Sequence, residues 1–299
     1  MKNKTILSLA LLGAISGTQL FADKAVLTPY GGRINNSSSV SQSIKDYSSI
    51  GGAHVAFSNL EYSFEADYAH VTTTYKDNDI PQLSQDDIAI SYSKYNSHYM
   101  LGGGLHYTDT TDKELGNGIV GFVKAEGYQI GKHDRFSYGV EAYFSYYGQG
   151  HNEAYLERSA KIFQLTPYIR YYTDSGDISN TAELKSYAQY SFNYSKKNYF
   201  TVEVSDTVYY KDFHITGSYY NGEMRTGVKN GGFVVYNTMD LYKEGYGIST
   251  GYQYKPYDIS FQMSYTRNSF REYDQTQSTI TQDNKADVWI FSVSKNFSI

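Results

Sequence analysis

The amino-acid sequence predicts an all-β protein, namely a transmembrane, antiparallel, up-and-down β-barrel of about 14 strands. Three observations carry this prediction. Apolar and polar residues alternate with a period of two, the alternating segments are long and similar in length, and short and long connections follow one another. Successive side chains of a strand point to opposite faces, so this alternation gives each strand one apolar and one polar face. No segment shows a sustained period of 3.6 that would favour helices.

The first 22 residues are expected to be a cleaved signal peptide and no part of the fold. Lys2 and Lys4 precede an apolar run over 6–15, and the stretch that ends in Ala22 has the character of a cleavage region. This is the secretory pattern, and the apolar run is too short to cross a bilayer as a helix. The predicted division is therefore a signal peptide over 1–22 and a transmembrane β-barrel over 23–299.

Composition excludes several protein classes. The chain of 299 residues has no cysteine, which excludes disulfide scaffolds and cysteine-ligated metal centres. Its 34 Tyr and 15 Phe argue against disorder, because disordered chains contain few aromatic residues. Loss of Lys2 and Lys4 lowers the basic count from 26 to 24 against 31 acidic residues, a net charge of −7. We therefore expect no nucleic-acid partner, since such a partner requires a basic surface.

Each predicted strand is an alternating segment bounded by polar residues. In 60–72, for example, Leu60, Tyr62 and Phe64 share one parity while Glu61, Ser63 and Glu65 share the other. Several segments keep phase for 9 to 13 residues, whereas ordinary strands average about 5–6 and a bilayer-crossing strand needs about 9–11. The predicted strands are 24–34, 47–57, 60–72, 86–95, 98–108, 118–130, 135–148, 160–172, 181–195, 198–209, 212–220, 246–255, 258–268 and 286–299.

The connections between these segments alternate in length. Short turns follow every second strand, and longer polar stretches lie between them at 35–46, 73–86, 109–117, 149–159, 221–245 and 269–285, with one short tip at 196–197. This is the outer-membrane pattern of periplasmic turns on one rim and external loops on the other, with an even strand count. The segment 221–245 is expected to be a long loop or an inserted hairpin, so 12 or 16 strands stay open.

The last predicted strand carries a family resemblance. Trp289, Phe291, Val293 and Phe297 share one parity, with polar residues at most of the alternate positions. This resembles the terminal strand of Gram-negative outer-membrane β-barrel proteins of the porin-like kind, which the barrel-assembly machinery reads as a signal. The usual final residue there is aromatic, whereas Ile299 follows Phe297 by two positions here. The resemblance covers the whole chain after residue 22, implies an outer-membrane location with outer-membrane lipid as a partner, and identifies no specific family or functional residue.

The tyrosines are expected at two kinds of position in such a barrel. Those near strand ends are expected to form aromatic girdles at the two membrane interfaces. The girdle candidates are Tyr92, Tyr107, Tyr146, Tyr171, Tyr194, Tyr219 and Tyr254. By the same parity, a second group is expected to point into the lumen and narrow it, namely Tyr128, Tyr143, Tyr147, Tyr168 and Tyr172.

Charged residues are expected on the lumenal faces of the strands. The acidic candidates are Glu61, Glu65, Asp67, Asp87, Glu126, Glu141, Glu183, Glu203 and Asp258, and the basic candidates are Lys124, Arg135, Arg170 and Lys185. Pairing would neutralise four of these nine acids. The remainder lower the free energy of a cation in the pore more than that of an anion, so the sequence predicts a weak cation preference.

Motifs for other chemistry are weak. The run 116–121 matches G-x-G-x-x-G, but no strand precedes it and no helix follows, as dinucleotide binding requires. His98 and His106 share a face but lie eight residues, roughly 26 Å, apart along a strand, which is too far for one metal. No G-x-S-x-G motif is present. We therefore expect no cofactor, no metal and no catalytic residues.

These observations favour an outer-membrane channel for passive diffusion or uptake of small hydrophilic solutes, and not an enzyme. A closed barrel that displays its loops for adhesion or partner binding is the alternative. A membrane-embedded hydrolase, in which a Ser–His or Asp–His pair assembles across strands, is a minor alternative. The sequence leaves open the solute, the pore radius and the choice between monomer and trimer.

Overall fold

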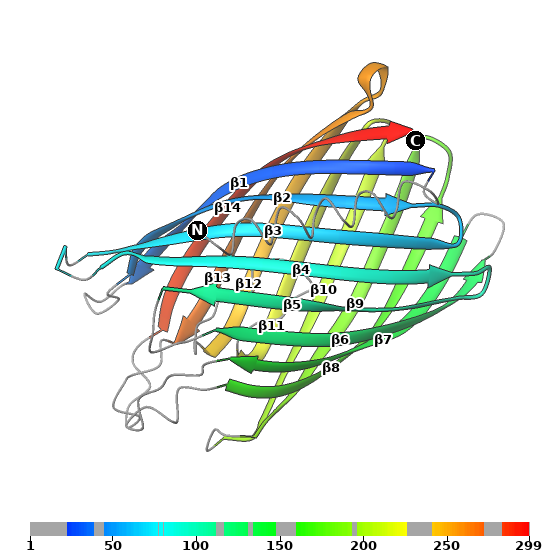
Figure 1. Cartoon of the computed structure of the whole chain (residues 1–299). Helices are drawn as coiled ribbons and strands as arrows, with labels where there is room; N and C mark the ends of the chain where they lie inside the picture. The colour runs from blue at the N-terminus through cyan, green and yellow to red at the C-terminus, as the bar shows by residue number, and fades with distance from the viewer. Residues whose placement is uncertain are drawn as a thin grey trace.

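Fourteen antiparallel strands follow one another around a closed barrel in the computed structural model of the chain (Figure 1). The structure describes residues 23–38, 45–76, 78–79, 81–111, 117–130, 134–147, 160–192, 196–225, 241–271 and 283–298. The strands are β1 (Lys24–Ser38), β2 (Lys45–Ser58), β3 (Tyr62–Tyr75), β4 (Leu83–Tyr95), β5 (Tyr99–Thr110), β6 (Gly118–Ile130), β7 (Asp134–Tyr147), β8 (Ala160–Asp174), β9 (Ile178–Ser191), β10 (Asn198–Tyr210), β11 (Phe213–Arg225), β12 (Leu241–Tyr254), β13 (Ile259–Arg271) and β14 (Asp283–Ser298).

Closure of the sheet joins the first strand to the last. β1 pairs with β14 from Lys24 opposite Ser298 to Ser38 opposite Asn284, and every other strand pairs with its neighbours in sequence. The Thr28 hydroxyl also donates to the Ser294 hydroxyl across this seam at 2.9 Å. The predicted antiparallel barrel of 14 strands is thus confirmed for the part of the chain that the structure describes.

Eleven of the fourteen strands are longer than the alternation alone predicted, and their lengths run from 12 residues in β5 to 16 in β14. Pairing continues past the alternating segments because ladder hydrogen bonds involve the backbone and need no particular side chain. β1, for example, was expected to end at Ile34 but runs on through Asn35 and Asn36 to Ser38.

The two faces of the sheet meet different surroundings. Large apolar side chains project outward and are exposed, among them Val123 at 63%, Phe200 at 57% and Phe291 at 53%. Polar side chains on the opposite parity are buried inside, as Thr108 and Thr201 are at 0%. An outward apolar band around a polar interior is the arrangement of a barrel whose outer solvent is lipid.

Short turns join the strands at the rim that carries both ends of the barrel. The Asn59 side chain accepts hydrogen bonds from the backbone N–H groups of Glu61 and Tyr62 at 2.8 and 2.9 Å, which fixes the β2–β3 turn. A 3₁₀ turn over Lys255–Tyr257 (η2) joins β12 to β13. There, the hydrogen bond and charge of Asp212, 2.6 Å away, raise the pKa of Lys255.

The predicted signal peptide and most of the predicted loop or hairpin over 221–245 lie outside the described residues. β11 and β12 include the two ends of that segment, so only 226–240 is left without description. No helix in the described ranges is long and apolar enough to cross a membrane.

The seam between β1 and β14 predicts a stability difference between two adjacent glycines. A Cβ at Gly32 would lie 2.3 Å from the Trp289 carbonyl oxygen, whereas a Cβ at Gly31 would meet only the Ile50 carbonyl oxygen at 3.7 Å. Gly32→Ala should therefore lower the free energy of unfolding by about 1–3 kcal/mol, the usual cost of overpacking. Urea unfolding of the refolded barrel measures this, and Gly31→Ala is the matched control. Equal stability of the two variants would contradict a tightly packed seam.

Candidate functional site

The structure places eleven of the thirteen predicted lumenal charges on strand positions that share the parity of the buried interior. These are Glu65, Asp67, Asp87, Lys124, Glu126, Arg135, Glu141, Arg170, Glu183, Lys185 and Glu203. The other two, Glu61 and Asp258, lie in short turns, where they are exposed. They fall outside the strands because the turn before β3 extends two residues further, and the turn before β13 one residue further, than the alternation suggests.

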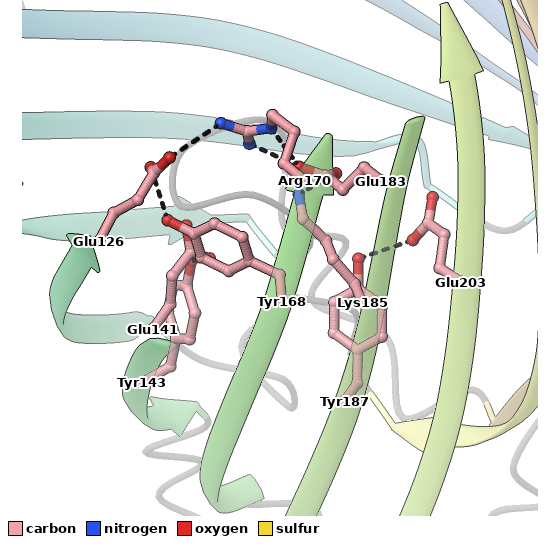
Figure 2. A network of polar contacts seen from close by, with 9 residues as sticks. All are labelled: Glu126, Glu141, Tyr143, Tyr168, Arg170, Glu183, Lys185, Tyr187 and Glu203. Carbon is pink, nitrogen blue, oxygen red and sulfur yellow. Dashed lines mark hydrogen bonds and ion pairs between the residues drawn. The ribbon is translucent and has the colours of Figure 1, made fainter. Parts of the chain in front are cut away.

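A polar network lines the interior of β6–β10 (Figure 2). Its centre is Arg170 on β8, whose guanidinium donates to Glu183 at 2.9 and 2.5 Å and to Glu126 at 3.4 Å. Lys185 lies 2.8 Å from the second Glu183 oxygen, and the Tyr168 hydroxyl donates to Glu126 at 2.8 Å. Two cations and two carboxylates from three strands are thus joined, which satisfies charges that would be costly to hold unpaired in a partly buried wall.

Two further tyrosines extend the network toward the long-loop rim. The Tyr187 hydroxyl donates to Glu203 at 2.6 Å, and the Tyr143 hydroxyl donates to Glu141 at 2.5 Å (Figure 2). Both rings are almost fully buried, at 1% exposure each. The inward tyrosines therefore act as hydrogen-bond donors to carboxylates as well as filling space.

Several lumenal tyrosines lie flat against the wall, each across a glycine of the neighbouring strand. A Cβ at Gly139 on β7 would lie 2.4 Å from the Tyr168 ring, and Tyr168 reaches past it to Glu126 on β6. The same relation holds where Tyr30 crosses Gly52 to Asp67 at 2.9 Å, and where Tyr220 crosses Gly245 to Asn268 at 2.9 Å. Because these rings run along the wall, they line the lumen without projecting toward its axis.

A second buried polar cluster lies on β4 and β5. The Asp87 carboxylate accepts hydrogen bonds from His106 Nε2 at 3.0 Å, Thr108 Oγ1 at 2.7 Å and Gln85 Nε2 at 2.7 Å. His106 Nδ1 is buried without a hydrogen-bond partner. The sequence predicted Asp87 as a lumenal charge but not this set, because the partners come together only through the cross-strand pairing of Asp87 with Thr108.

One part of the inner wall is apolar. Ile34, Ile50, Val71, Phe270 and Val288 form one buried cluster on the inner faces of β1, β2, β3, β13 and β14, together with Ala69 and Ala286. In the closed order of strands β8 is seven positions from β1 in either direction, so this cluster lies on the opposite side of the barrel from β8 and nearer the long-loop rim than Arg170. Sequence reasoning assigned apolar residues to the outer wall and missed this inner apolar surface.

Arg225 is a lumenal cation that the sequence did not predict. A bulge between Asn221 and Met224, with Gly222 at φ +135°, shifts the end of β11 so that Met224 and Arg225 are both buried. The Arg225 Nε donates to the Tyr199 hydroxyl at 2.9 Å, and its backbone N–H donates to Gln189 at 2.7 Å. A one-residue irregularity of this kind leaves no clear signal in period-two alternation.

Burial of the inward side chains changes along the barrel. On β10, Tyr199 and Thr201 near the long-loop rim are 4% and 0% exposed, whereas Tyr209 near the turn rim is 40% exposed. β8 shows the same trend, from Ile162 at 2% to Arg170 at 29%. On these two strands, the inward side chains are more exposed to water near the turn rim than near the long-loop rim.

The girdle candidates within the described ranges occupy outward positions near the strand ends or in the loop-side half. Tyr92, Tyr107, Tyr171, Tyr219 and Tyr254 are 40–51% exposed, and Tyr146 shares their face. Tyr194 lies outside the described residues. The predicted assembly residues of the last strand face outward as well, with Trp289 at 44%, Phe291 at 53% and Phe297 at 46% exposed, and Val293 on the same parity.

Among the described residues, no group of three or more His, Asp or Glu is arranged to hold a metal ion. The Asp87 carboxylate accepts three hydrogen bonds from protein side chains.

Comparison with known proteins places the fold. No protein-family model matches the chain, and no curated protein matches it in sequence. Among solved structures, the CymD monoaromatic hydrocarbon channel is similar, with a TM-score of 0.52, 8% identity, and coverage of 94% of this chain and 90% of that one. The Ralstonia pickettii toluene transporter TbuX has a TM-score of 0.51 and 7% identity, with coverage of 93% of this chain and 90% of that one. CdiB from Acinetobacter baumannii has a TM-score of 0.53 and 10% identity, with coverage of 91% of this chain and 60% of that one.

The chain has the fold of Gram-negative outer-membrane β-barrel proteins. This is the resemblance that the sequence predicted, again without a specific family. At such low identities the similarity extends to the fold alone, so it assigns no solute to this barrel.

The contact between Tyr168 and Gly139 predicts a coupled stability effect. A Cβ at residue 139 would lie 2.4 Å from the ring and 2.7 Å from the Ala125 carbonyl oxygen. Gly139→Ala should destabilise the barrel by about 1–3 kcal/mol because the ring must leave the wall and lose Glu126. The cost should be smaller in a Tyr168→Ala background, which a double-mutant cycle on unfolding free energies measures. Gly217→Ala, where a Cβ meets nothing within 4 Å, is the control and should have little effect. If Gly139→Ala lowers the free energy of unfolding equally with and without the Tyr168 ring, the coupling is excluded.

Proposed function

We propose that the protein is an outer-membrane channel for passive diffusion or uptake of small hydrophilic solutes, with a weak cation preference. The observation that carries the proposal is the charged, hydrogen-bonded wall of β6–β10 inside a closed barrel of 14 strands. Eight-stranded barrels are filled by side chains and barrels of 16–18 strands hold a channel, so 14 strands leave room for a narrow one. The similar structures that are named as channels and transporters support the same role.

The charges of the lumenal wall support the cation preference. Of the predicted lumenal residues that lie on strand faces, seven are acidic and four are basic, and Arg225 adds a fifth cation. Arg170 and Lys185 are both engaged with Glu183. Within the described contacts Glu65 has no ion pair, and Glu141 is hydrogen-bonded by a neutral hydroxyl and not by a cation. These carboxylates contribute negative potential to the path of an ion.

The location and assembly of the barrel are part of the proposal. The chain would cross the outer membrane after removal of residues 1–22, and the barrel-assembly machinery would recognise Trp289, Phe291, Val293 and Phe297 on β14. The outward exposure of these aromatic residues is compatible with that role.

A closed barrel that displays its loops for partner binding is the second candidate. The observation in its favour is the burial of inward side chains at the long-loop level, such as Thr108 and Thr201 at 0% exposure. Purified protein in planar lipid bilayers separates the two functions, since a channel gives discrete conductance steps. A correctly folded barrel that stays silent would refute the channel.

Removal of the two carboxylates that form no ion pair in the described contacts, Glu65 and Glu141, should change the ion selectivity of the channel. In a salt gradient, the double variant Glu65→Gln, Glu141→Gln should shift the zero-current potential toward zero. One charge about 8 Å from an ion in water changes its energy by about 0.5 kcal/mol. Because a carboxylate stabilises K⁺ and destabilises Cl⁻ by this amount, the permeability ratio of K⁺ to Cl⁻ should fall about fivefold for each charge removed. Glu61→Gln, in an exposed turn, is the matched control. An unchanged ratio in the double variant would show that these side chains do not face the ion path.

A further inference from the structure

A row of outward-facing residues crosses β1 to β5 on the membrane side of the barrel. Cross-strand pairing places Gly31 opposite Gly51, Gly51 opposite His70, His70 opposite Asp86, and Asp86 opposite Asp109. These residues share the parity of the outer wall, so none of them belongs to the lumen described above. The row brings an imidazole and two carboxylates onto one patch of the outer surface.

His70 connects a hydroxyl to a carboxylate in this row. Its Nδ1 lies 2.9 Å from Asp86 Oδ1, and its Nε2 lies 3.2 Å from Thr72 Oγ1 on the same strand. The Tyr68 hydroxyl donates to the same Asp86 oxygen at 2.6 Å and so fixes the carboxylate from its other side. Thr72, His70 and Tyr68 occupy alternate positions of β3 and therefore face the same way.

This order of contacts is that of a nucleophile, a general base and a carboxylate that orients the base. A carboxylate that accepts the Nδ1 proton holds the imidazole in the tautomer whose Nε2 has a free lone pair. That lone pair faces the Thr72 hydroxyl within the range at which a base removes a proton. A hydroxyl, an imidazole and a carboxylate are the groups that acyl transfer requires, and they are recognised by geometry and not by sequence position.

The triad lies where the outer wall changes from apolar to polar. On β3 the outward residues are Phe64, Ala66 and Tyr68, and then His70 and Thr72. On β4 the same change occurs between Ile88, which is the register partner of Tyr68, and Asp86, which is the register partner of His70. A bilayer-crossing strand uses about 9–11 residues, which from Tyr62 ends near Thr72. The triad therefore lies at the upper edge of the apolar band, on the side of the long loops.

The triad is accessible from that edge. The side chains of His70 and Asp86 are 45% and 39% exposed. Beside His70, a Cβ at Gly51 would meet nothing within 4 Å, so the neighbouring strand leaves open space at the imidazole. Ser49 and Ser84 are the register partners of Thr72 on the two flanking strands and share its face, which places hydroxyl donors on either side of the nucleophile.

We propose that Thr72 and His70 are the catalytic residues of an acyl-ester hydrolase on the outer wall of the barrel, with Asp86 and Tyr68 as positioning residues. The substrate class is the acyl ester of a membrane lipid, whose chain lies along the apolar band while its ester linkage meets the triad at the edge of that band. This activity is independent of the lumen and of the proposed channel.

The reaction balances without a cofactor. Thr72 Oγ1 attacks the ester carbonyl carbon as its proton passes to His70 Nε2, and the tetrahedral intermediate releases the alcohol, which takes that proton. Water then attacks the acyl-threonine ester with His70 again as base, and the carboxylic acid leaves as Thr72 regains its proton. The sum is one ester and one water giving one acid and one alcohol.

The test uses the full-length refolded barrel with two probes, p-nitrophenyl butyrate in detergent and phosphatidylethanolamine vesicles with labelled acyl chains. Thr72→Val and His70→Asn should each lower kcat/KM by about 10³-fold or more, as loss of a triad member does. Thr72→Ser should keep activity, because it retains the hydroxyl. Asp86→Asn should lower kcat by about 10²–10⁴-fold with little change in KM. A fluorophosphonate should label Thr72 in wild type, as mass spectrometry of the tryptic peptide reports.

Controls separate chemistry from folding. His98→Gln, which alters a histidine in an exposed turn whose ring Nδ1 contacts the Ser97 hydroxyl, should keep full activity. Thr72→Val should retain the unfolding transition and the bilayer conductance of wild type, since it changes only the outer wall. The proposal is overturned if folded wild type neither hydrolyses the esters nor labels at Thr72, or if Thr72→Val matches wild type. Either result would leave the channel proposal intact, just as a silent bilayer would leave the hydrolase intact.

Discussion

Every feature of this protein depends on the hydrogen-bonded seam between β1 and β14. Without that seam, two strand edges would present unpaired N–H and C=O groups to hydrocarbon, where each costs several kcal/mol. With it, the side chains divide into two sets that meet different solvents. The tight approach of Gly32 to the Trp289 carbonyl oxygen shows that even the smallest side chain has no room at this point.

The tyrosines of the lumen follow from the same closure. Inward side chains of a closed sheet converge, so a ring that pointed at the axis would obstruct the lumen. Tyr30, Tyr168 and Tyr220 avoid this by crossing a glycine on the next strand and donating to a polar group two strands away. Each ring therefore ties three strands together, and an abundance of tyrosine is compatible with an interior that water still reaches from the turn side.

Much of the fold could be read from the sequence because period-two alternation reports directly on strand faces. The outward position of Trp289 and the inward position of Arg170 follow from parity, and segment lengths with alternating connections gave about 14 strands in sequence order. Parity could not show which groups meet, since contacts such as His70 with Asp86 depend on register. It also failed where both faces are apolar, as at Val288, Trp289 and Ile290, because an inner apolar wall then looks like part of the outer one.

A polar network on β6–β10 and an apolar cluster on the opposite side of the barrel, nearer the long-loop rim, make the lumen anisotropic. A solute that is polar at one end and apolar at the other has one favoured orientation in such a space. If the solute rotates about the barrel axis, its polar end meets apolar side chains and its apolar end meets polar ones. In the proposed channel, passage would cost rotational entropy for every solute but would return enthalpy only to those whose polar and apolar ends match the two surfaces. Two molecules of equal size and charge would therefore cross at different rates, according to where on each molecule its hydroxyl groups are placed.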